Sequence, residues 1–232
     1  MDVTVKTARW TGMLYLIMFF AAIFSEFFVR SSLIVPGDAA ATVNNLLASE
    51  TLFRTSFISD FIVLFCDLGV AILFYVLLKP VNSTIAMTAM IARLIMVPMR
   101  GINLLNNLTA LSLVGGSAAS DAFTPEQLQT LVQTFLSAYG NGFHLDLVFF
   151  ALHCLLLGYL LYKSDLFPGI LGILMVIAGV FYFIDSFTAI LAPASSAVVS
   201  QIVMLPNVIA ELTLTLWLLI RGVRRVEQPE NA

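Results

Sequence analysis

The stretch MTAMIARLIMVPMRGINLLNNLTALS, residues 87–112, decides how the chain folds. It is largely apolar, yet it carries Arg93, Arg100, Asn103 and Asn107. At about 100° per residue, these four side chains fall within about 80° on one helical face. A charge at bilayer depth costs about 2.5–3.5 kcal/mol per arginine. The face must therefore contact protein or water, and acidic groups on other apolar segments are its expected partners.

The composition is that of a membrane protein. The chain has 232 residues, of which 60% are hydrophobic and 11% are charged, whereas a soluble domain carries about 25% charged residues. The net charge of −3 provides no basic field for nucleic acid, and no nucleic-acid motif is present. Cys66 and Cys154 fit no zinc spacing, so we interpret them as buried small hydrophobic residues.

Six segments are long enough to span a bilayer, which takes about 20 predominantly apolar residues. They are residues 8–29, 56–78, 84–113, 142–162, 168–191 and 198–220. The first resembles the start of a signal peptide, but no A-x-A cleavage site follows it and more spans come after, so we interpret it as a retained span. The sequence thus predicts an all-α bundle of six transmembrane helices forming a single domain over residues 1–232.

The orientation follows from the lysines and arginines beside the spans. If the N-terminus lies in the cytoplasm, the inner flanks hold seven of the eleven basic residues. These are Lys6, Arg9, Lys79, Lys163, Arg221, Arg224 and Arg225. The second and third outer loops contain no lysine or arginine. We therefore predict that both termini are cytoplasmic.

Residues 124–138 carry the signals of a further helix. Thr124 and Gln127 form a capping-box pattern, with a proline at the first helical position. Apolar residues recur on one face and polar residues occupy the other, which predicts an amphipathic helix at the outer interface. The alternative is a helix continuous with the fourth span, interrupted at Gly140 and Gly142.

Residues 38–54 form a second candidate interface helix, which opens with Asp38 as an N-cap candidate. With this segment, the same order of elements occurs twice along the chain. Each copy has an outer helical segment, an inward span, a short turn containing lysine and an outward span. Residues 74–79 are locally similar to residues 158–163. The pattern indicates a parallel internal repeat, or a coincidence among common membrane residues.

Nearly every ionisable residue inside the spans lies at the midplane or in the outer half. Asp67 lies 12 residues from Lys79, about 18 Å from the inner turn, and Arg93 lies at a similar depth. We therefore predict a polar chamber in the outer half, above an apolar floor. Its candidate ligand-binding or network residues are Glu26, Arg30, Asp60, Asp67, Arg93, Arg100, Asn103, Asn107, Asp146, His153, Asp185, Asn207 and Glu211.

Carboxylates outnumber arginines among these residues, six to three. Unpaired buried carboxylates must be protonated, hydrated or bound to a cation. Asp67 and Glu211 are the deepest acids and the best candidate partners of Arg93.

The same residues have plainer interpretations. Buried polar groups also specify how helices pair, and His153 fits a hydrogen-bonded interior histidine as well as a ligand. Asp146, His153, Asp185 and Glu211 show no metal-ligand spacing such as H-E-x-x-H, so we predict no metal site. No motif identifies a cofactor or a catalytic residue.

Several stretches resemble a bacterial membrane-protein family named domain of unknown function 4386. They are SEFFVR (25–30), PGDAA (36–40), SD (59–60), CD (66–67), YVLLKP (75–80), NLLN (103–106), LHCLLLGYLLYKS (152–164), LG (171–172), DSF (185–187) and AEL (210–212). The resemblance covers nearly the whole chain, and residues 152–164 are its most specific part. The chain departs from the family pattern at Asp165 and Gly169, in an inner turn. The resemblance implies a multi-pass domain of the prokaryotic inner membrane and no established activity.

Three functions remain open. The first is binding or transport of a small polar or cationic solute through the outer-facing chamber. The second is an intramembrane enzyme that uses Asp67, His153 and Glu211 on a lipid-derived substrate. The third is a structural or assembly subunit whose charges fix packing. The bilayer is the expected partner, a small solute or a lipid the expected ligand, and the oligomeric state does not follow from the sequence.

Overall fold

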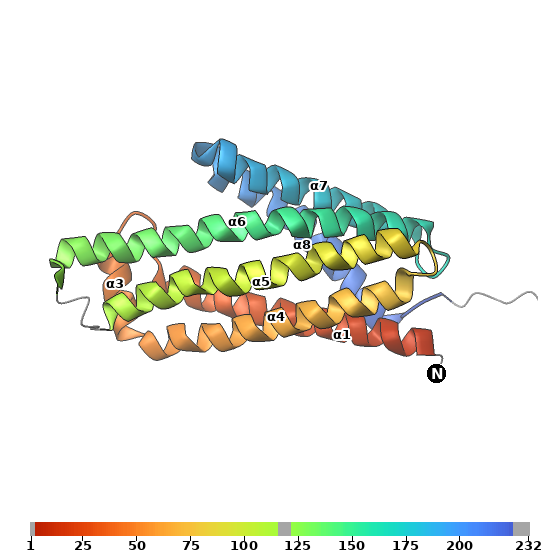
Figure 1. The fold of residues 1–232 in the computed structure, drawn as a ribbon, viewed down its shortest axis with the longest axis horizontal. Helices are drawn as coiled ribbons and strands as arrows, with labels where there is room; N and C mark the ends of the chain where they lie inside the picture. Colours follow the sequence, from red (N-terminus) through yellow and green to blue (C-terminus); the bar gives the residue numbers. More distant parts are fainter. Residues whose placement is uncertain (1–2, 116–121, 225–232) are drawn as a thin grey trace, which may run out of the picture. The chain divides into compact units, whose positions relative to one another are not determined.

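The computed structural model describes residues 3–115 and 122–224 of the chain. Within them the protein is helical and contains no β-strand (Figure 1). In chain order the elements are α1 (Val3–Ile23), the π-helix η1 (Phe24–Arg30), α2 (Ser31–Leu33), α3 (Ala39–Ala48), α4 (Glu50–Leu78), α5 (Ser83–Val114), α6 (Pro125–Lys163), α7 (Gly169–Leu191) and α8 (Pro193–Ile220).

Six helical segments in the described residues are long and apolar enough to cross a membrane, which confirms the predicted all-α architecture. They are Thr4–Leu33, Glu50–Leu78, Ser83–Val114, Pro125–Lys163, Gly169–Leu191 and Pro193–Ile220. The first comprises α1, η1 and α2 in continuous succession. Most are longer than expected, because polar turns at the ends of helices lower the local hydropathy without ending the helix.

The predicted segment 124–138 is the first part of α6, so of the two interpretations the structure shows the continuous helix. The capping box forms, since the Thr124 N–H donates to Gln127 Oε1 at 3.0 Å and the Gln127 N–H donates to Thr124 Oγ1 at 3.4 Å. No interruption occurs at Gly140 or Gly142. A Cβ at Gly142 would overlap the Asn103 amide, so this glycine permits a close approach of α5 rather than a break in the helix.

The other predicted interface segment, residues 38–54, divides between α3 and the first turn of α4. Asp38 caps α3 as expected, because its carboxylate accepts from the Ala41 N–H at 2.8 Å. Thr42 Oγ1 accepts from the Val35 N–H at 2.9 Å and ties α3 to the connection before it.

The chain divides into two compact units built from interleaved segments. Unit 1 comprises residues 1–16, 66–96 and 144–232, and unit 2 comprises residues 17–65 and 97–143. Helices α1, α4, α5 and α6 contribute residues to both units, whereas α7 and α8 belong to unit 1 and α3 belongs to unit 2. The units are therefore not successive domains along the sequence.

Glycines allow close helix packing in unit 1. A Cβ at Gly158 of α6 would lie 2.7 Å from the Gly172 carbonyl of α7, and a Cβ at Gly172 would lie 2.5 Å from the Gly158 carbonyl. The backbones of α6 and α7 thus approach each other closely at small residues, as is common where helices pack in membranes.

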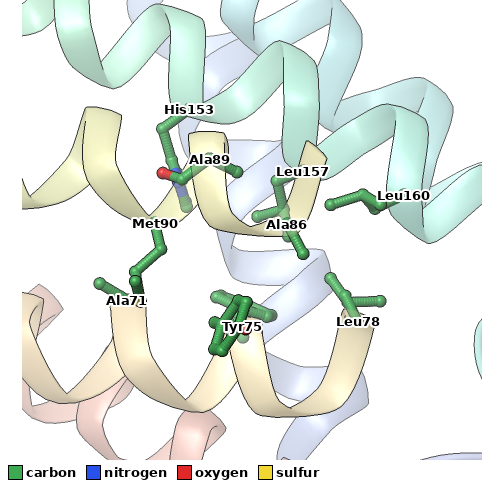
Figure 2. Close-up of a pocket in the computed structure, with 10 residues that line it drawn as sticks. Ala71, Tyr75, Leu78, Ala86, Ala89, Met90, His153, Leu157 and Leu160 are labelled. Atoms are coloured by element: carbon green, nitrogen blue, oxygen red, sulfur yellow. The ribbon is translucent and has the colours of Figure 1, made fainter. Parts of the chain in front are cut away.

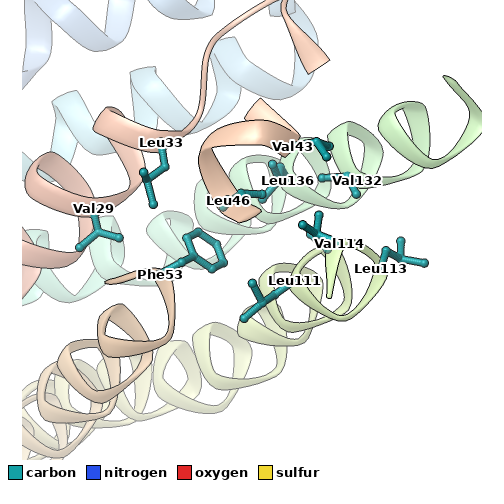
Figure 3. Packing of buried hydrophobic residues seen from close by; sticks show 11 residues of the cluster. Val29, Leu33, Val43, Leu46, Phe53, Leu111, Leu113, Val114, Val132 and Leu136 are labelled. Atoms are coloured by element: carbon teal, nitrogen blue, oxygen red, sulfur yellow. The ribbon is translucent and has the colours of Figure 1, made fainter. Parts of the chain in front are cut away.

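Unit 2 contains an apolar core that joins the short helix α3 to three of the long helices (Figure 3). Its buried members are Val29, Leu33, Val43, Leu46, Phe53, Ala110, Leu111, Leu113, Val114, Val132 and Leu136. Val132 and Leu136 come from the apolar stripe at the start of α6, and Leu128, Leu131 and Phe135 pack against them. The stripe predicted for a membrane interface therefore packs against protein.

We predict that Gly172→Ala destabilises the protein by about 1–3 kcal/mol, the usual cost of overpacking. The added methyl group meets backbone atoms of Gly158 and Tyr162, which cannot move aside as a flexible side chain can. The free energy of unfolding in mixed detergent–SDS micelles measures the effect. Gly140→Ala is the control, because a Cβ there meets no atom within 4 Å. Equal stability of the two variants would contradict the close packing of α6 and α7.

Candidate functional site

The predicted polar residues divide between the two units. Unit 1 contains Asp67, Arg93, Asp146, His153, Asp185, Asn207 and Glu211. Unit 2 contains Glu26, Arg30, Asp60, Arg100, Asn103 and Asn107. The polar stripe on α5 is therefore divided between the units. Arg93 belongs to unit 1, and Arg100, Asn103 and Asn107 belong to unit 2. The polar residues are therefore described within each unit.

Four helices each contribute one polar side chain to a cluster around Arg93, which we name the Arg93 cluster. Tyr15 comes from α1, Asp67 from α4, Arg93 from α5 and His153 from α6. All four side chains are almost completely shielded, and Arg93 is 0% exposed. A buried ion pair among apolar helices is tolerated only when its polar groups find partners, and in this cluster all three nitrogens of Arg93 donate a hydrogen bond.

Arg93 donates to three different residues. Its Nε and Nη2 donate to Asp67 Oδ1 at 2.9 and 2.6 Å. Its Nη1 donates to Tyr15 Oη at 3.1 Å and lies 3.1 Å from His153 Nε2. Of the two candidate partners that depth indicated, Asp67 and Glu211, the structure pairs Asp67 with Arg93.

The contacts of His153 show which of its two ring nitrogens carries a proton. An arginine nitrogen can only donate, so His153 Nε2 accepts from Arg93. His153 Nδ1 lies 2.9 Å from the Ala89 carbonyl oxygen, which can only accept, so Nδ1 carries the proton. The ring is therefore neutral, and both of its nitrogens are hydrogen-bonded.

Aromatic rings enclose the guanidinium of Arg93. Its Cζ lies 4.9 Å from the centroid of the Tyr15 ring and 5.2 Å from that of Phe150. Both distances suit cation–π attraction, which strengthens when the cation is desolvated. Phe150 also stacks on His153, with ring centroids 6.0 Å apart. The guanidinium of Arg93 and the rings of Tyr15, Phe150 and His153 thus pack against one another.

A cavity of about 10 Å³, large enough for about one water, lies beside His153 (Figure 2). Helices α4, α5 and α6 line it almost entirely with apolar side chains and alanines. Its lining residues are Ala71, Phe74, Tyr75, Leu78, Ala86, Ala89, Met90, His153, Leu157 and Leu160. This cavity is too small for an organic solute.

Two further acids of unit 1 lie on α7 and α8 and bond to hydroxyl groups. The Tyr182 hydroxyl contacts Glu211 Oε1, and the Ser200 hydroxyl contacts Asp185 Oδ1. His144 Nδ1 lies 3.5 Å from Asp185 Oδ2. Among the described residues, the partners of Asp185 are thus a hydroxyl and a histidine ring, with no arginine or lysine.

Two other buried polar groups lie on the same helices. Ser186 Oγ on α7 and Asn207 Oδ1 on α8 have no hydrogen-bond partner among the described residues. Asp146 is fully buried on α6 and does not belong to this pair. The α7–α8 part of unit 1 therefore contains more polar groups than its own hydrogen bonds satisfy.

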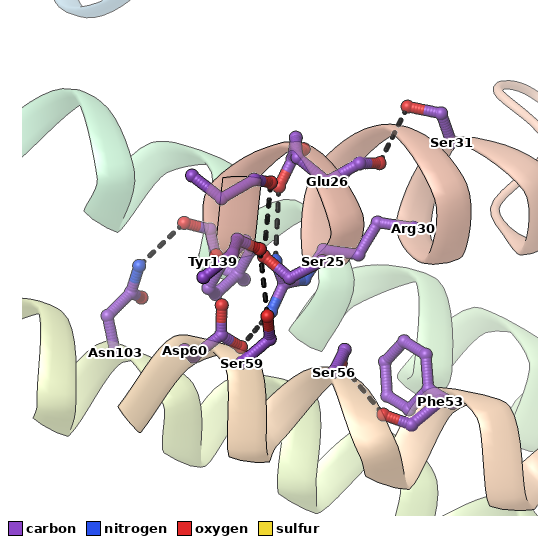
Figure 4. Close-up of polar contacts among 12 residues, drawn as sticks. Ser25, Glu26, Arg30, Ser31, Phe53, Ser56, Ser59, Asp60, Asn103 and Tyr139 are labelled. Atoms are coloured by element: carbon purple, nitrogen blue, oxygen red, sulfur yellow. Dashed lines mark hydrogen bonds and ion pairs between the residues drawn. The ribbon is translucent and has the colours of Figure 1, made fainter. Parts of the chain in front are cut away.

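The polar cluster of unit 2 centres on Arg30, at the end of η1, and we name it the Arg30 cluster (Figure 4). Arg30 donates from Nη2 to Asp60 of α4 and from Nη1 to Glu26 Oε2 at 3.1 Å. Its Cζ lies 4.8 Å from the ring centroid of Tyr139 on α6. In the π-helix, the Ser31 N–H donates to the Glu26 carbonyl five residues back. Such π-turns are frequent at functional sites.

The remaining residues of the α5 stripe also lie in unit 2. Asn103 Nδ2 donates to the Tyr139 carbonyl at 2.8 Å, and the Arg100 guanidinium lies over the Phe143 ring at 5.3 Å. Asn107 is fully buried, and neither atom of its amide has a partner among the described residues. Three members of the stripe, Arg93, Asn103 and Asn107, are therefore buried in protein, and Arg100 is half-buried.

The described residues contain no group of three or more histidines, cysteines and acids that could hold a metal ion. Cys66 and Cys154 are free thiols, and both are buried. No cofactor follows from these geometries.

The sequence analysis missed Tyr15 and Tyr139, the two rings that lie against the buried arginines. A tyrosine in an apolar helix is too common to mark a site. The signal that could have found Tyr15 is its depth on the first span, together with the hydroxyl that a buried tyrosine must satisfy.

We predict that Asp67→Asn destabilises the protein by about 3–5 kcal/mol, because it leaves the Arg93 charge buried without its anion. The free energy of unfolding in mixed micelles measures this loss. The double variant Asp67→Asn with Arg93→Gln should recover part of it, since no charge then remains. Glu50→Gln is the control, because its exposed pair with Arg54 is worth about 0–1 kcal/mol. Additive losses in the double variant would contradict the pairing.

The chain is 29% identical over 130 residues to an uncharacterised protein of Archaeoglobus fulgidus, a match that covers 56% of this chain and 64% of the relative. The matched part thus spans less than two thirds of that relative. No solved structure matches the chain significantly. The sequence model of a family described as a domain of unknown function (DUF4386) matches residues 10–222, and the chain therefore belongs to that family.

Proposed function

We propose that this protein binds a small cationic solute at the carboxylates of unit 1 and moves it across the cytoplasmic membrane of a prokaryote. The observation that carries the proposal is the environment of Asp185. It is a buried carboxylate whose partners among the described residues are a hydroxyl and a histidine ring. A buried carboxylate without an arginine or lysine partner is stabilised by a proton, water or a cation, and we propose that Asp185 exchanges one of these for another.

Neighbouring groups extend this acidic region. Glu211 on α8 bonds to the Tyr182 hydroxyl, and Phe150, which packs against Tyr182, also lies against Arg93. Glu211 is close enough to Tyr15 to interact with it electrostatically. Glu211 and the Arg93 cluster are thus neighbours within unit 1.

The closed packing of the Arg93 cluster favours a second candidate, a structural or assembly subunit. Arg93 is fully shielded, and its bonds to Asp67, Tyr15 and His153 satisfy it without a ligand. The enzyme alternative has less support, because both nitrogens of His153 are already hydrogen-bonded and neither is positioned to transfer a proton.

Cation binding is tested by thermal unfolding of the purified protein with methylammonium or sodium, at constant ionic strength. A ligand at 100 times its Kd stabilises a protein by about 2.7 kcal/mol, so the wild type should unfold at a higher temperature in one of the two cations. Asp185→Asn should lose that increase. Glu50→Gln, which removes an exposed charge at the start of α4, should keep it.

Uptake of radiolabelled methylammonium or sodium into proteoliposomes then separates binding from transport. If the cation still raises the unfolding temperature of Asp185→Asn, the solute-binding proposal is contradicted. If neither cation changes the unfolding temperature while Asp185→Asn remains folded, the structural candidate is favoured.

We also infer that both termini are cytoplasmic, from the seven basic residues that the inner flanks hold in that orientation. Green fluorescent protein fused to the C-terminus should fluoresce. Alkaline phosphatase fused after Ala192, between α7 and α8, should be active, whereas the same fusion after Asn82, between α4 and α5, should be inactive. The opposite pattern of phosphatase activity would reverse the orientation.

A further inference from the structure

Unit 2 contains a groove that the polar clusters do not explain. It has a volume of about 290 Å³ and lies between α4 and α5. Its lining residues are Arg54, Phe57, Phe61, Gly101, Leu104, Leu105 and Leu108. All but the arginine and the glycine are large apolar side chains, and Phe61, Leu105 and Leu108 are exposed.

The groove runs along the helices. Each of its walls covers eight residues, from Arg54 to Phe61 and from Gly101 to Leu108. The seven steps of 1.5 Å between the first and the last residue correspond to about 10 Å. Gly101 has no side chain to fill its part of the groove. A Cβ there would meet only Leu64, at 3.7 Å, which is an ordinary contact. The groove is therefore elongated and apolar, and the absence of a side chain at Gly101 leaves space in it.

Arg54 gives the groove one charged end. Helix α4 has 29 residues and is about 44 Å long, whereas the hydrocarbon core of a bilayer is about 30 Å thick. Arg54 is in the second turn of α4, so it lies near the level of the lipid headgroups while the rest of the groove extends toward the acyl chains.

The present partner of Arg54 is replaceable. Arg54 pairs with Glu50 on the same helix, at 2.7 Å from Nη2 to Oε1, and both side chains are exposed. An exposed ion pair of this kind contributes little. A guanidinium binds phosphate oxygens with a two-pronged geometry, so a lipid phosphate can take the place of the carboxylate.

We propose that this groove is a binding site for one anionic phospholipid, whose acyl chain lies along Phe57, Phe61 and Leu105 and whose phosphate binds Arg54. The apolar walls match the chain, and the single cation at the headgroup end matches the phosphate. The site is separate from the acids of unit 1 and does not depend on their proposed function.

Native mass spectrometry of the detergent-purified full chain tests the site, with palmitoyl-oleoyl phosphatidylglycerol and phosphatidylcholine as probes. The wild type should retain one phosphatidylglycerol and prefer it over phosphatidylcholine. Gly101→Leu should raise the apparent Kd for phosphatidylglycerol about tenfold by filling the groove. Arg54→Gln should remove most of the preference for phosphatidylglycerol while binding of phosphatidylcholine changes little.

Two control variants isolate these effects. Gly140→Leu adds the same side chain at a glycine with no atom within 4 Å, and Arg221→Gln removes an exposed arginine at the end of α8. Both should bind phosphatidylglycerol as the wild type does, and the unfolding temperature of every variant verifies that it is folded.

Three results would overturn the proposal. The first is equal binding by Gly101→Leu and Gly140→Leu. The second is loss of lipid preference in Arg221→Gln as large as that in Arg54→Gln. The third is conversion of a dimer to a monomer by Gly101→Leu with phosphatidylglycerol binding unchanged, which would make the groove an interface between two copies of the chain.

Discussion

The structure of unit 1 depends on the burial of one guanidinium among apolar helices. Arg93 is fully shielded, and a charge at that depth is tolerated only when an anion lies beside it and its N–H groups find acceptors. Asp67, Tyr15 and His153 meet these needs from three other helices. One side chain on α5 thus specifies the rotation and depth of α1, α4 and α6 together, which apolar packing alone would specify only weakly.

Unit 2 pairs its own buried arginine through the same chemistry. Arg30 pairs with Asp60 and lies over the ring of Tyr139, as Arg93 pairs with Asp67 and lies over that of Tyr15. The two aspartates are seven residues apart and hence on one face of α4. The two clusters differ in how far their side chains are exposed. Arg30 also bonds to Glu26, which is half exposed, whereas every member of the Arg93 cluster is shielded.

Four of the acids therefore fall into two kinds. Asp60 and Asp67 neutralise arginines and hold helices together. Asp185 and Glu211 bond to hydroxyl groups, which can donate to a carboxylate or accept from a carboxylic acid. In the proposed function the first kind maintains the bundle and the second kind exchanges protons and cations. This difference explains how a tightly packed bundle can retain acids that its own arginines do not require.

The sequence by itself determined the class of the protein, its six spans and the need to bury the α5 stripe, because hydropathy and the cost of a charge in lipid act on each segment separately. Depth counted along the spans also limited the candidate partners of Arg93 to Asp67 and Glu211, and the structure shows the pair with Asp67. Only the tertiary structure decided the rest. Tyr15 and Tyr139 became partners of arginines because of helix rotations that no single segment encodes. Gly142 remained inside α6 because α5 approaches it, and the stripe of Val132 and Leu136 faced protein because α3 and α5 supplied apolar neighbours.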